Sequence, residues 1–267
     1  YGVRKLWIVN VGDLKPMEYP ITFFLDMAWN PDKFNAQNLQ QHAEEFCARQ
    51  FGRTYAKEAA RILSLYAKYN RRVTPEMLNA KTYSFNYGEW ERVVNEYNTL
   101  ALDAHNLGFL LPSEYRDAYD QLISFPVQAC SNLYNMYYAQ AKNQALAAKK
   151  DPEANYWADK VASCFQRDSI LTDYYHKTIS DGKWNHLMSQ IHIGYTSWNN
   201  PEKRTMPKIT RVPERSVPYT FKETKGYVSI EAEHFTRAVS EGKTTWSIIP
   251  GFGKTLSGIT TLPVSYT

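Results

Sequence analysis

A cluster of polar side chains that could carry chemistry follows a short apolar run near the start of the sequence. Asn10, Asp13, Lys15 and Glu18 come directly after residues 6–9, which are all apolar. Carboxylates at the end of a strand can act as an acid, a base or a stabiliser of charge. These four residues are therefore the first candidates for a functional site.

The element that must position this cluster is a strand. The continuous apolar run of residues 6–9 is typical of a strand buried on both faces, and prolines then lead into a helix predicted over residues 21–29. Ligands of α/β proteins bind at the carboxyl ends of parallel strands, where these face a helix. A plainer interpretation is a capped turn, in which Asp13 bonds backbone amides while Lys15 and Glu18 are solvated. The local pattern leaves both interpretations open.

This cluster does not by itself supply a complete pair of catalytic acid and base. A hydrolase that uses two carboxylates with inversion needs them about 6.5–9.5 Å apart, on opposite sides of the bond that is cleaved. One loop does not readily place both of them. We therefore expect any complete acid/base pair on residues upstream of Tyr1.

Other groups of reactive side chains indicate chemistry more weakly. His186 and His192 lie six positions apart, which is a poor spacing for zinc. Glu231 and Glu233 alternate on one predicted strand face, which fits a solvated edge better than a calcium site or a catalytic pair. Nucleotide-binding glycine patterns, nucleophile elbows and Cys-x-x-Cys pairs do not occur. We expect neither a metal nor a cofactor.

The composition argues against several classes of protein. The 267 residues carry a formal net charge of +4 from mixed charges, without the dense basic runs that indicate nucleic-acid binding. No apolar stretch approaches the roughly 18 residues of a membrane-spanning helix, so we expect no membrane insertion. Cys47, Cys130 and Cys164 are widely spaced and fit buried free thiols better than disulfides, metal ligands or nucleophiles.

Most of the sequence has the periodicity of helices. Apolar residues recur at intervals of three and four. The segments with this pattern are residues 35–51, 53–69, 87–107, 113–150 and 151–181. Pro126 is expected to bend the fourth helix rather than end it, because the periodicity resumes after it. Short connections between the segments predict a mainly α fold, with an antiparallel bundle of about five long helices over residues 32–182.

The remaining segments divide the rest of the chain. Residues 1–31 hold the predicted strand and helix, and residues 183–225 form an extended connector that is rich in aromatic residues and proline. Strand patterns cover residues 227–235 and 246–250, so residues 226–267 are predicted to start a β domain that is too short to close a sandwich of its own. The first residue is not Met and the first strand has no parallel partner, so we expect a segment of a longer protein.

Three blocks of the sequence are informative when they are taken together, in their order along the chain. The first is LWIVNVGDLKPME at residues 6–18 with FLDMAW at residues 24–29. The second runs from WNHLM to HIGYTSW over residues 184–198, and the third joins IEAEHFT at residues 230–236 to PGFGKT at residues 250–255. Together they resemble glycoside hydrolase family 115, the xylan α-glucuronidases. The resemblance implies the last strand and helix of a (β/α)8 catalytic barrel, a whole helical domain, and the opening of a carbohydrate-binding-like β-sandwich.

The resemblance also implies an activity. Family members remove glucuronic acid or its 4-O-methyl ether, α-1,2-linked to xylose, from xylan with inversion, so the implied partner is glucuronoxylan or its oligosaccharides. The implied acid and base lie on earlier barrel strands, upstream of this chain. Asn10 matches a polar position at the floor of the pocket, where it would bind a sugar hydroxyl or orient the attacking water.

The other site candidates are less specific. The implied substrate-binding residues are Lys15, Glu18, Asp13, His192, Tyr195 and Trp198. Lys15 would meet the uronate carboxylate as a point charge. The last three either contact the site or a subunit interface, or serve packing alone. Loop and cap roles also explain Asp13 and Glu18.

The resemblance further implies a secreted or periplasmic bacterial enzyme that forms a homodimer through its helical domain. Two alternatives stay open: a non-enzymatic helical scaffold that binds a partner helix, and a hydrolase of another uronide. A scaffold has no need of Asn10 after four apolar residues, so the polar end of the predicted strand favours the hydrolase.

Overall fold

The chain divides into two compact units. The computed structural model describes residues 2–12, 14–197, 199–213, 221, 223–235, 237–239, 242, 244–254 and 256–262, so the predicted site residues Asp13 and Trp198 lie outside the described residues. Unit 1 consists of Tyr1–Ala141 and Lys160–Lys208, and unit 2 consists of Lys142–Asp159 and Ile209–Thr267.

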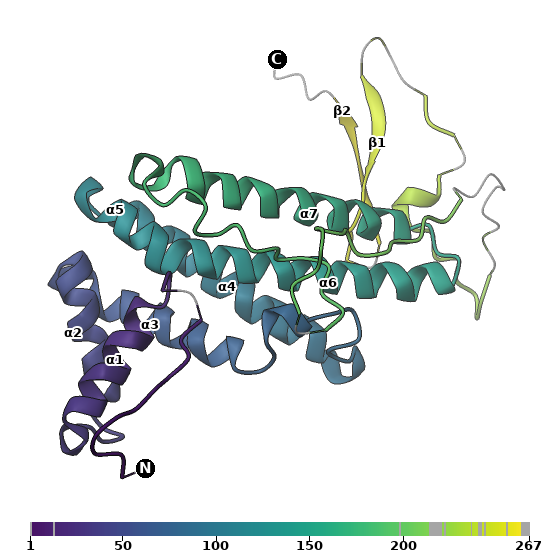
Figure 1. Cartoon of the computed structure of the whole chain (residues 1–267). Coiled ribbons are helices and arrows are strands. Elements are labelled where there is room, and N and C mark those ends of the chain that lie inside the picture. The colour runs from purple at the N-terminus through teal and green to yellow at the C-terminus, as the bar shows by residue number, and fades with distance from the viewer. Residues whose placement is uncertain are drawn as a thin grey trace. The chain divides into compact units, whose positions relative to one another are not determined.

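Helices make up most of the described chain, as Figure 1 shows. They are α1 (Glu18–Trp29), α2 (Leu39–Phe51), α3 (Arg53–Asn70), α4 (Glu89–Leu110), α5 (Ser113–Tyr119), α6 (Phe125–Ala148) and α7 (Ala154–Lys177). Short 3-10 turns lie at Pro31–Lys33, Pro75–Met77, Asn86–Gly88 and Ile179–Gly182. The predicted mainly α fold is confirmed, and none of the described helices is long and apolar enough to cross a membrane.

The core of unit 1 is built from the apolar stripes of α2 to α6. Phe51, Ile62, Leu100 and Tyr119 are fully buried there, and each comes from the inward face of its helix. Gly52 makes the sharp turn between α2 and α3 possible, because its φ of +80° is a conformation that residues with a side chain rarely adopt. α2 therefore ends at residue 51 and α3 begins at residue 53, and the two helices pack side by side (Figure 1).

One helical stretch runs from α5 through a π-helical turn, Asp120–Ser124, into α6. Pro126 explains the wide turn, because proline has no N–H for the carbonyl of Leu122 and its ring crowds that carbonyl. The backbone N–H of Phe125 donates instead to the carbonyl of Asp120. The prediction that the helix continues through Pro126 is confirmed.

The predicted buried strand over residues 6–9 is not formed within the described chain, so its place in a barrel stays a prediction. These residues form no strand, and Leu6 and Ile8 are 75% and 85% exposed. A strand needs a neighbour to pair its backbone groups and to cover its side chains, and none of the described residues supplies one. The helix that follows begins at Glu18, three residues earlier than predicted, and none of its residues is buried.

Unit 2 holds the strands. β1 (Thr245–Ile249) pairs antiparallel with β2 (Gly258–Leu262), which confirms a strand within residues 246–250. The predicted strand over residues 227–235 is wrong, since that part of the chain has one isolated bridge, from Thr224 to Tyr227, and a 3-10 turn at Ala232–His234. The predicted domain boundaries, including the opening of a β-sandwich, stay predictions.

Asparagine side chains hold the extended segment of unit 2 at residues 209–213. Asn143 is fully buried, and its amide exchanges two hydrogen bonds with the backbone of Thr210, at 2.8 and 2.9 Å. Asn155 makes the same pair of bonds with Val212, at 2.8 and 2.9 Å. An amide that both donates and accepts imitates a strand neighbour, so the extended segment at residues 209–213 is held without a sheet.

Candidate functional site

Asn10 lies exposed in the loop that precedes α1. Its side-chain Oδ1 accepts a hydrogen bond of 2.9 Å from the backbone N–H of Gly12. This Asx turn orients the amide through its own backbone. The predicted role of Asn10 at a pocket is not tested by these contacts, but the side chain is not occupied by packing.

Lys15 and Glu18 are brought together by a residue far away in the sequence. Lys15 Nζ lies 2.5 Å from Glu18 Oε1 and donates to Gln121 Oε1 at 3.3 Å. Gln121 Nε2 donates to the same Glu18 oxygen at 3.0 Å. Gln121 lies in the π-helical turn and is only 5% exposed. We call Lys15, Glu18 and Gln121 the amide triangle.

An aromatic ring covers the amide triangle. Lys15 Nζ lies 4.1 Å from the centre of the Trp184 ring, within the range of a cation–π contact. Trp184 packs against a small core cluster that consists of Phe125, Tyr175 and Ile179. Burial, and next the negative charge of Glu18, raise the pKa of Tyr175 to about 12.

The charges of the amide triangle are therefore already used within the chain. Glu18 Oε1 accepts two hydrogen bonds, and its Oε2 is buried without a partner among the described residues. A carboxylate held in this way is a better structural anion than a proton-transfer group. Lys15, in turn, would need to exchange Glu18 for a uronate carboxylate in order to bind substrate.

His192 belongs to a second polar cluster, which is centred on Asp168 of α7. Its Nδ1 lies 2.8 Å from Asp168 Oδ1, and Arg204 Nε donates to Asp168 Oδ2 at 3.0 Å. Asp168 is 5% exposed, and the Arg204 guanidinium stacks 3.6 Å above the Phe165 ring centre. This geometry accounts for His192 as an anchor of the segment after α7.

Tyr195 follows His192 in a separate set of contacts. Its hydroxyl accepts from Gln190 Nε2 and donates to Asn200 Oδ1, each at 3.0 Å. The site candidates thus fall into two groups, one around Lys15 and Glu18 and the other on the segment after α7. Whether they share a substrate stays a prediction.

Sequence reasoning missed Gln121. The signal that could have found it is an amide directly before the apolar pair Leu122 and Ile123, shortly before Pro126. A helix rarely buries such a group unless it has partners. The sequence does not reveal that those partners lie 103 and 106 residues away.

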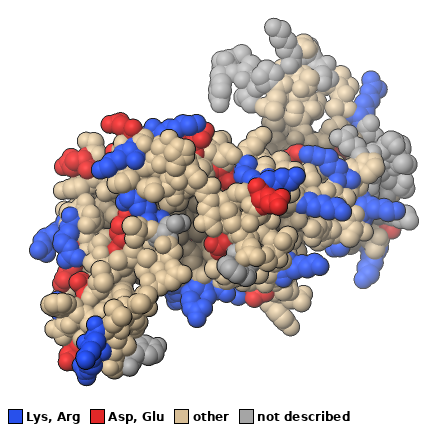
Figure 2. Space-filling view, in the orientation of Figure 1, with Lys and Arg blue, Asp and Glu red and all other residues tan. Residues whose placement is uncertain are grey.

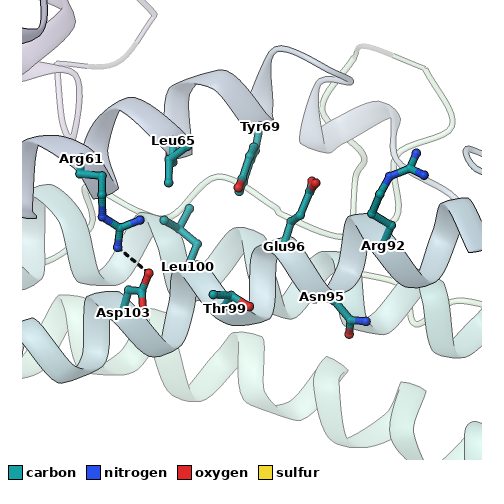
Figure 3. A pocket seen from close by; sticks show the side chains of 9 residues that line it. All are labelled: Arg61, Leu65, Tyr69, Arg92, Asn95, Glu96, Thr99, Leu100 and Asp103. Carbon is teal, nitrogen blue, oxygen red and sulfur yellow. Dashed lines mark hydrogen bonds and ion pairs between the residues drawn. The ribbon is translucent and has the colours of Figure 1, made fainter.

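A groove of about 370 Å³ lies elsewhere in unit 1, between α3 and α4 (Figure 3). Its lining residues are Arg61, Leu65, Tyr69, Arg92, Asn95, Glu96, Thr99, Leu100 and Asp103. Most of its charges are paired: Arg61 with Glu58 and Asp103, and Glu96 with Arg72. The hydrogen bond from Arg61 lowers the pKa of Glu58. This groove is best explained as the ion-paired seam between two helices.

Metal and nucleophile chemistry find little support in the described residues. No group of three or more His, Cys, Asp or Glu side chains there could hold a metal ion. Burial raises the pKa of the Cys47 thiol to about 12 and that of Cys130 to about 11, so neither is a reactive thiolate. On the face in Figure 2, cationic and anionic side chains are interspersed over the helices.

Comparisons with known proteins match both ends of the chain to one family. The family model "Glycosyl hydrolase family 115" matches residues 1–77, and "Glycosyl hydrolase family 115 C-terminal domain" matches residues 220–267. Among solved structures, the chain resembles a family GH115 4-O-methyl-α-glucuronidase, BtGH115A, with specificity for decorated arabinogalactans. The TM-score is 0.60 and the identity 22%, over 94% of this chain and 34% of that chain.

The match to the solved structure covers only part of that protein. The chain spans about a third of the length of that solved structure, and the likeness at 22% identity shows the fold alone. The search of curated proteins found no match. The two family models nevertheless match opposite ends of the chain, in the order that the three sequence blocks predicted. Both ends of the chain are therefore similar to glycosyl hydrolase family 115.

Proposed function

We propose that this chain is part of a glycoside hydrolase that releases glucuronic acid, or its 4-O-methyl ether, from xylan side chains by inverting hydrolysis. The observation that carries the proposal is the match of both ends of the chain to family 115 models. The solved 4-O-methyl-α-glucuronidase with the same fold supports the choice of glucuronic acid as the sugar that is released.

The exposed N-terminal segment supports the proposal that the chain includes the end of a catalytic barrel. Residues 6–9 are all apolar and all exposed, and α1 buries none of its residues. Exposed apolar surface of this kind is typical of an interface. In our proposal this run and α1 are the last strand and helix of a (β/α)8 barrel, and residues 226–267 open a β-sandwich.

Within that arrangement, Asn10 is the candidate for substrate contact. Its side chain is exposed and held by Gly12, so it is free to bind a sugar hydroxyl or to orient the attacking water. The general acid and base would come from earlier barrel strands. Lys15 stays the candidate for the uronate carboxylate, with Glu18 as the partner that it would have to release.

The direct test is the release of uronic acid from glucuronoxylan by the full-length protein. We expect Asn10→Ala to lower kcat about 10- to 100-fold, because a misplaced substrate or water has that effect. The melting temperature should stay within about 2 °C, since an exposed side chain contributes little to stability. Asn79→Ala is the matched control, because Asn79 is also exposed and caps the backbone two residues on. A melting temperature that falls with the activity would make Asn10 structural.

A second uronide substrate is favoured by the solved relative. That protein is described as having specificity for decorated arabinogalactans. The assay should therefore include an arabinogalactan that carries glucuronic acid. Release from arabinogalactan but not from xylan would replace our proposal with this second one. A protein that releases no uronic acid from either polymer would favour the scaffold alternative.

Assembly and localisation are separate parts of the proposal. We expect a homodimer formed through the helical domain, in a secreted or periplasmic bacterial protein. Light scattering coupled to gel filtration of the full-length protein measures the first expectation. A monomer over the whole accessible concentration range would contradict it.

A further inference from the structure

The amide triangle brings two distant parts of the chain into one small contact. Lys15 and Glu18 belong to the loop and first turn of α1, whereas Gln121 belongs to the π-helical turn. Gln121 lies more than 100 residues from both Lys15 and Glu18 in the sequence. The contact therefore fixes the loop that carries Asn10 to the helical core.

Both ends of the Gln121 amide are used, and in opposite ways. The nitrogen donates to the Glu18 carboxylate, and the oxygen accepts from the Lys15 ammonium. The reverse orientation would set a donor against a cation and an acceptor against an anion, so the chemistry of the partners fixes the orientation. An amide serves a cation and an anion at once, which neither a carboxylate nor an ammonium group can do.

The helix is distorted at the position where this contact is made. Gln121, Leu122 and Ile123 are three consecutive buried residues. Leu122 and Ile123 join the core there, while Gln121 faces the loop. π-turns of this kind are frequent at functional sites.

We propose that Gln121 is a positioning residue, which holds Lys15 and Glu18 and thereby fixes the geometry of the Asn10 loop for substrate. This inference rests on the proposed hydrolase function. Gln121 is buried and makes its contacts through two other residues, so it does not touch the sugar in this account. Its effect would be on how the loop is held.

The test compares two glutamines on the same helical stretch of the full-length protein. Gln121→Ala removes the triangle. Gln128→Ala is the matched control, because Gln128 also makes two bonds, to the carbonyl of Ala101 and from Arg167, away from the loop. We expect Gln121→Ala to lower kcat on glucuronoxylan about 10- to 100-fold with little change in KM, and Gln128→Ala to stay within about twofold. Equal activity of the two variants would overturn the proposal.

A third variant separates positioning from simple loss of packing. Gln121→Glu sets a second carboxylate beside Glu18, and the two repel each other at neutral pH. As the pH falls, a shared proton restores one donor and one acceptor at position 121. We expect its activity relative to wild type to rise as the pH falls from about 7 to 5, near the raised pKa of such a carboxylate pair. A constant ratio at all pH values would contradict the positioning role.

Hydrogen exchange distinguishes failure of this inference from failure of the proposed function. We expect the amides of Gly12 and Met17, which donate hydrogen bonds within this loop, to exchange roughly tenfold faster in Gln121→Ala than in wild type, with no change in Gln128→Ala. If wild type cleaves no uronide, the function fails while this measurement still reports on the loop. Unchanged exchange in Gln121→Ala would overturn the positioning role whether or not the protein is active.

Discussion

Two segments of unit 1 have little regular structure, and they differ in how far their apolar side chains are buried. In residues 2–17, Leu6 and Ile8 are 75% and 85% exposed. In residues 183–208, Ile193 is fully buried and Trp184 packs against a core cluster. The difference lies in the partners of the apolar side chains: Trp184 and Ile193 of the second segment are packed within unit 1, whereas Leu6 and Ile8 of the first segment stay exposed. An irregular segment is thus ordered by specific side-chain contacts rather than by its own backbone pattern.

The largest expected effect comes from replacing one isoleucine in each of the two segments. We expect Ile193→Ala to lower the free energy of unfolding by about 2–4 kcal/mol, because it leaves a cavity in a packed site. Ile8→Ala should change it by less than about 0.5 kcal/mol, because the side chain is exposed. Urea denaturation of the chain, followed by circular dichroism, measures both.

The same two variants, made in the full-length protein, test whether residues 6–9 become buried there. If residues 6–9 are a barrel strand there, Ile8→Ala should become costly, at about 1.5 kcal/mol or more, since burial of that side chain is restored. A cost that stays near zero in the full-length protein would contradict the barrel proposal for this segment.

A smaller effect is expected at the ion pair that anchors the second segment. Asp168→Ala should cost about 2 kcal/mol, because it leaves Arg204 and His192 without their buried carboxylate, although both partners are partly exposed. Asp173→Ala on the same helix is the control, since its pair with Lys177 is mostly exposed and should contribute less than about 0.5 kcal/mol. Equal costs would mean that Asp168 does not anchor residues 183–208.

The helical part of the fold was predictable because helices satisfy their own backbone hydrogen bonds. The apolar stripes of α2, α3 and α4 and the continuation past Pro126 are encoded within single segments of sequence. The predicted strand at residues 227–235 failed for the complementary reason, and residues 6–9 have no strand neighbour among the described residues. A strand depends on a neighbour that the local pattern does not name, and only residues 246–250 found one.

The candidate site was predictable in part. The sequence indicated Lys15 and Glu18 from their place after an apolar run, and the structure joins them. It did not indicate Gln121, because the value of a buried amide depends on groups brought to it by the fold. Local spacing therefore locates candidates, and only packing assigns their partners.

The smallest expected effect concerns pH and the first part of the second segment. His176 Nε2 accepts a hydrogen bond of 3.1 Å from the backbone N–H of Met188, which requires that nitrogen to be unprotonated. Burial, and next the nearby His186, lower the pKa of His176. His192 and Lys177 act in the same direction, and Asp173 opposes them.

Because the pKa of His176 is lowered in the folded protein, the unfolded chain binds the extra proton more readily. Its contribution to stability is then fully present above about pH 6.5, the usual value for histidine, and is lost as the pH falls through the lowered folded pKa. The ring is partly exposed, so we expect less than about 1 kcal/mol. His176→Gln keeps an acceptor for Met188 without a titrating group and should flatten this part of the stability curve between about pH 5 and 7. A stability curve that His176→Gln leaves unchanged would show that the Met188 contact does not depend on protonation.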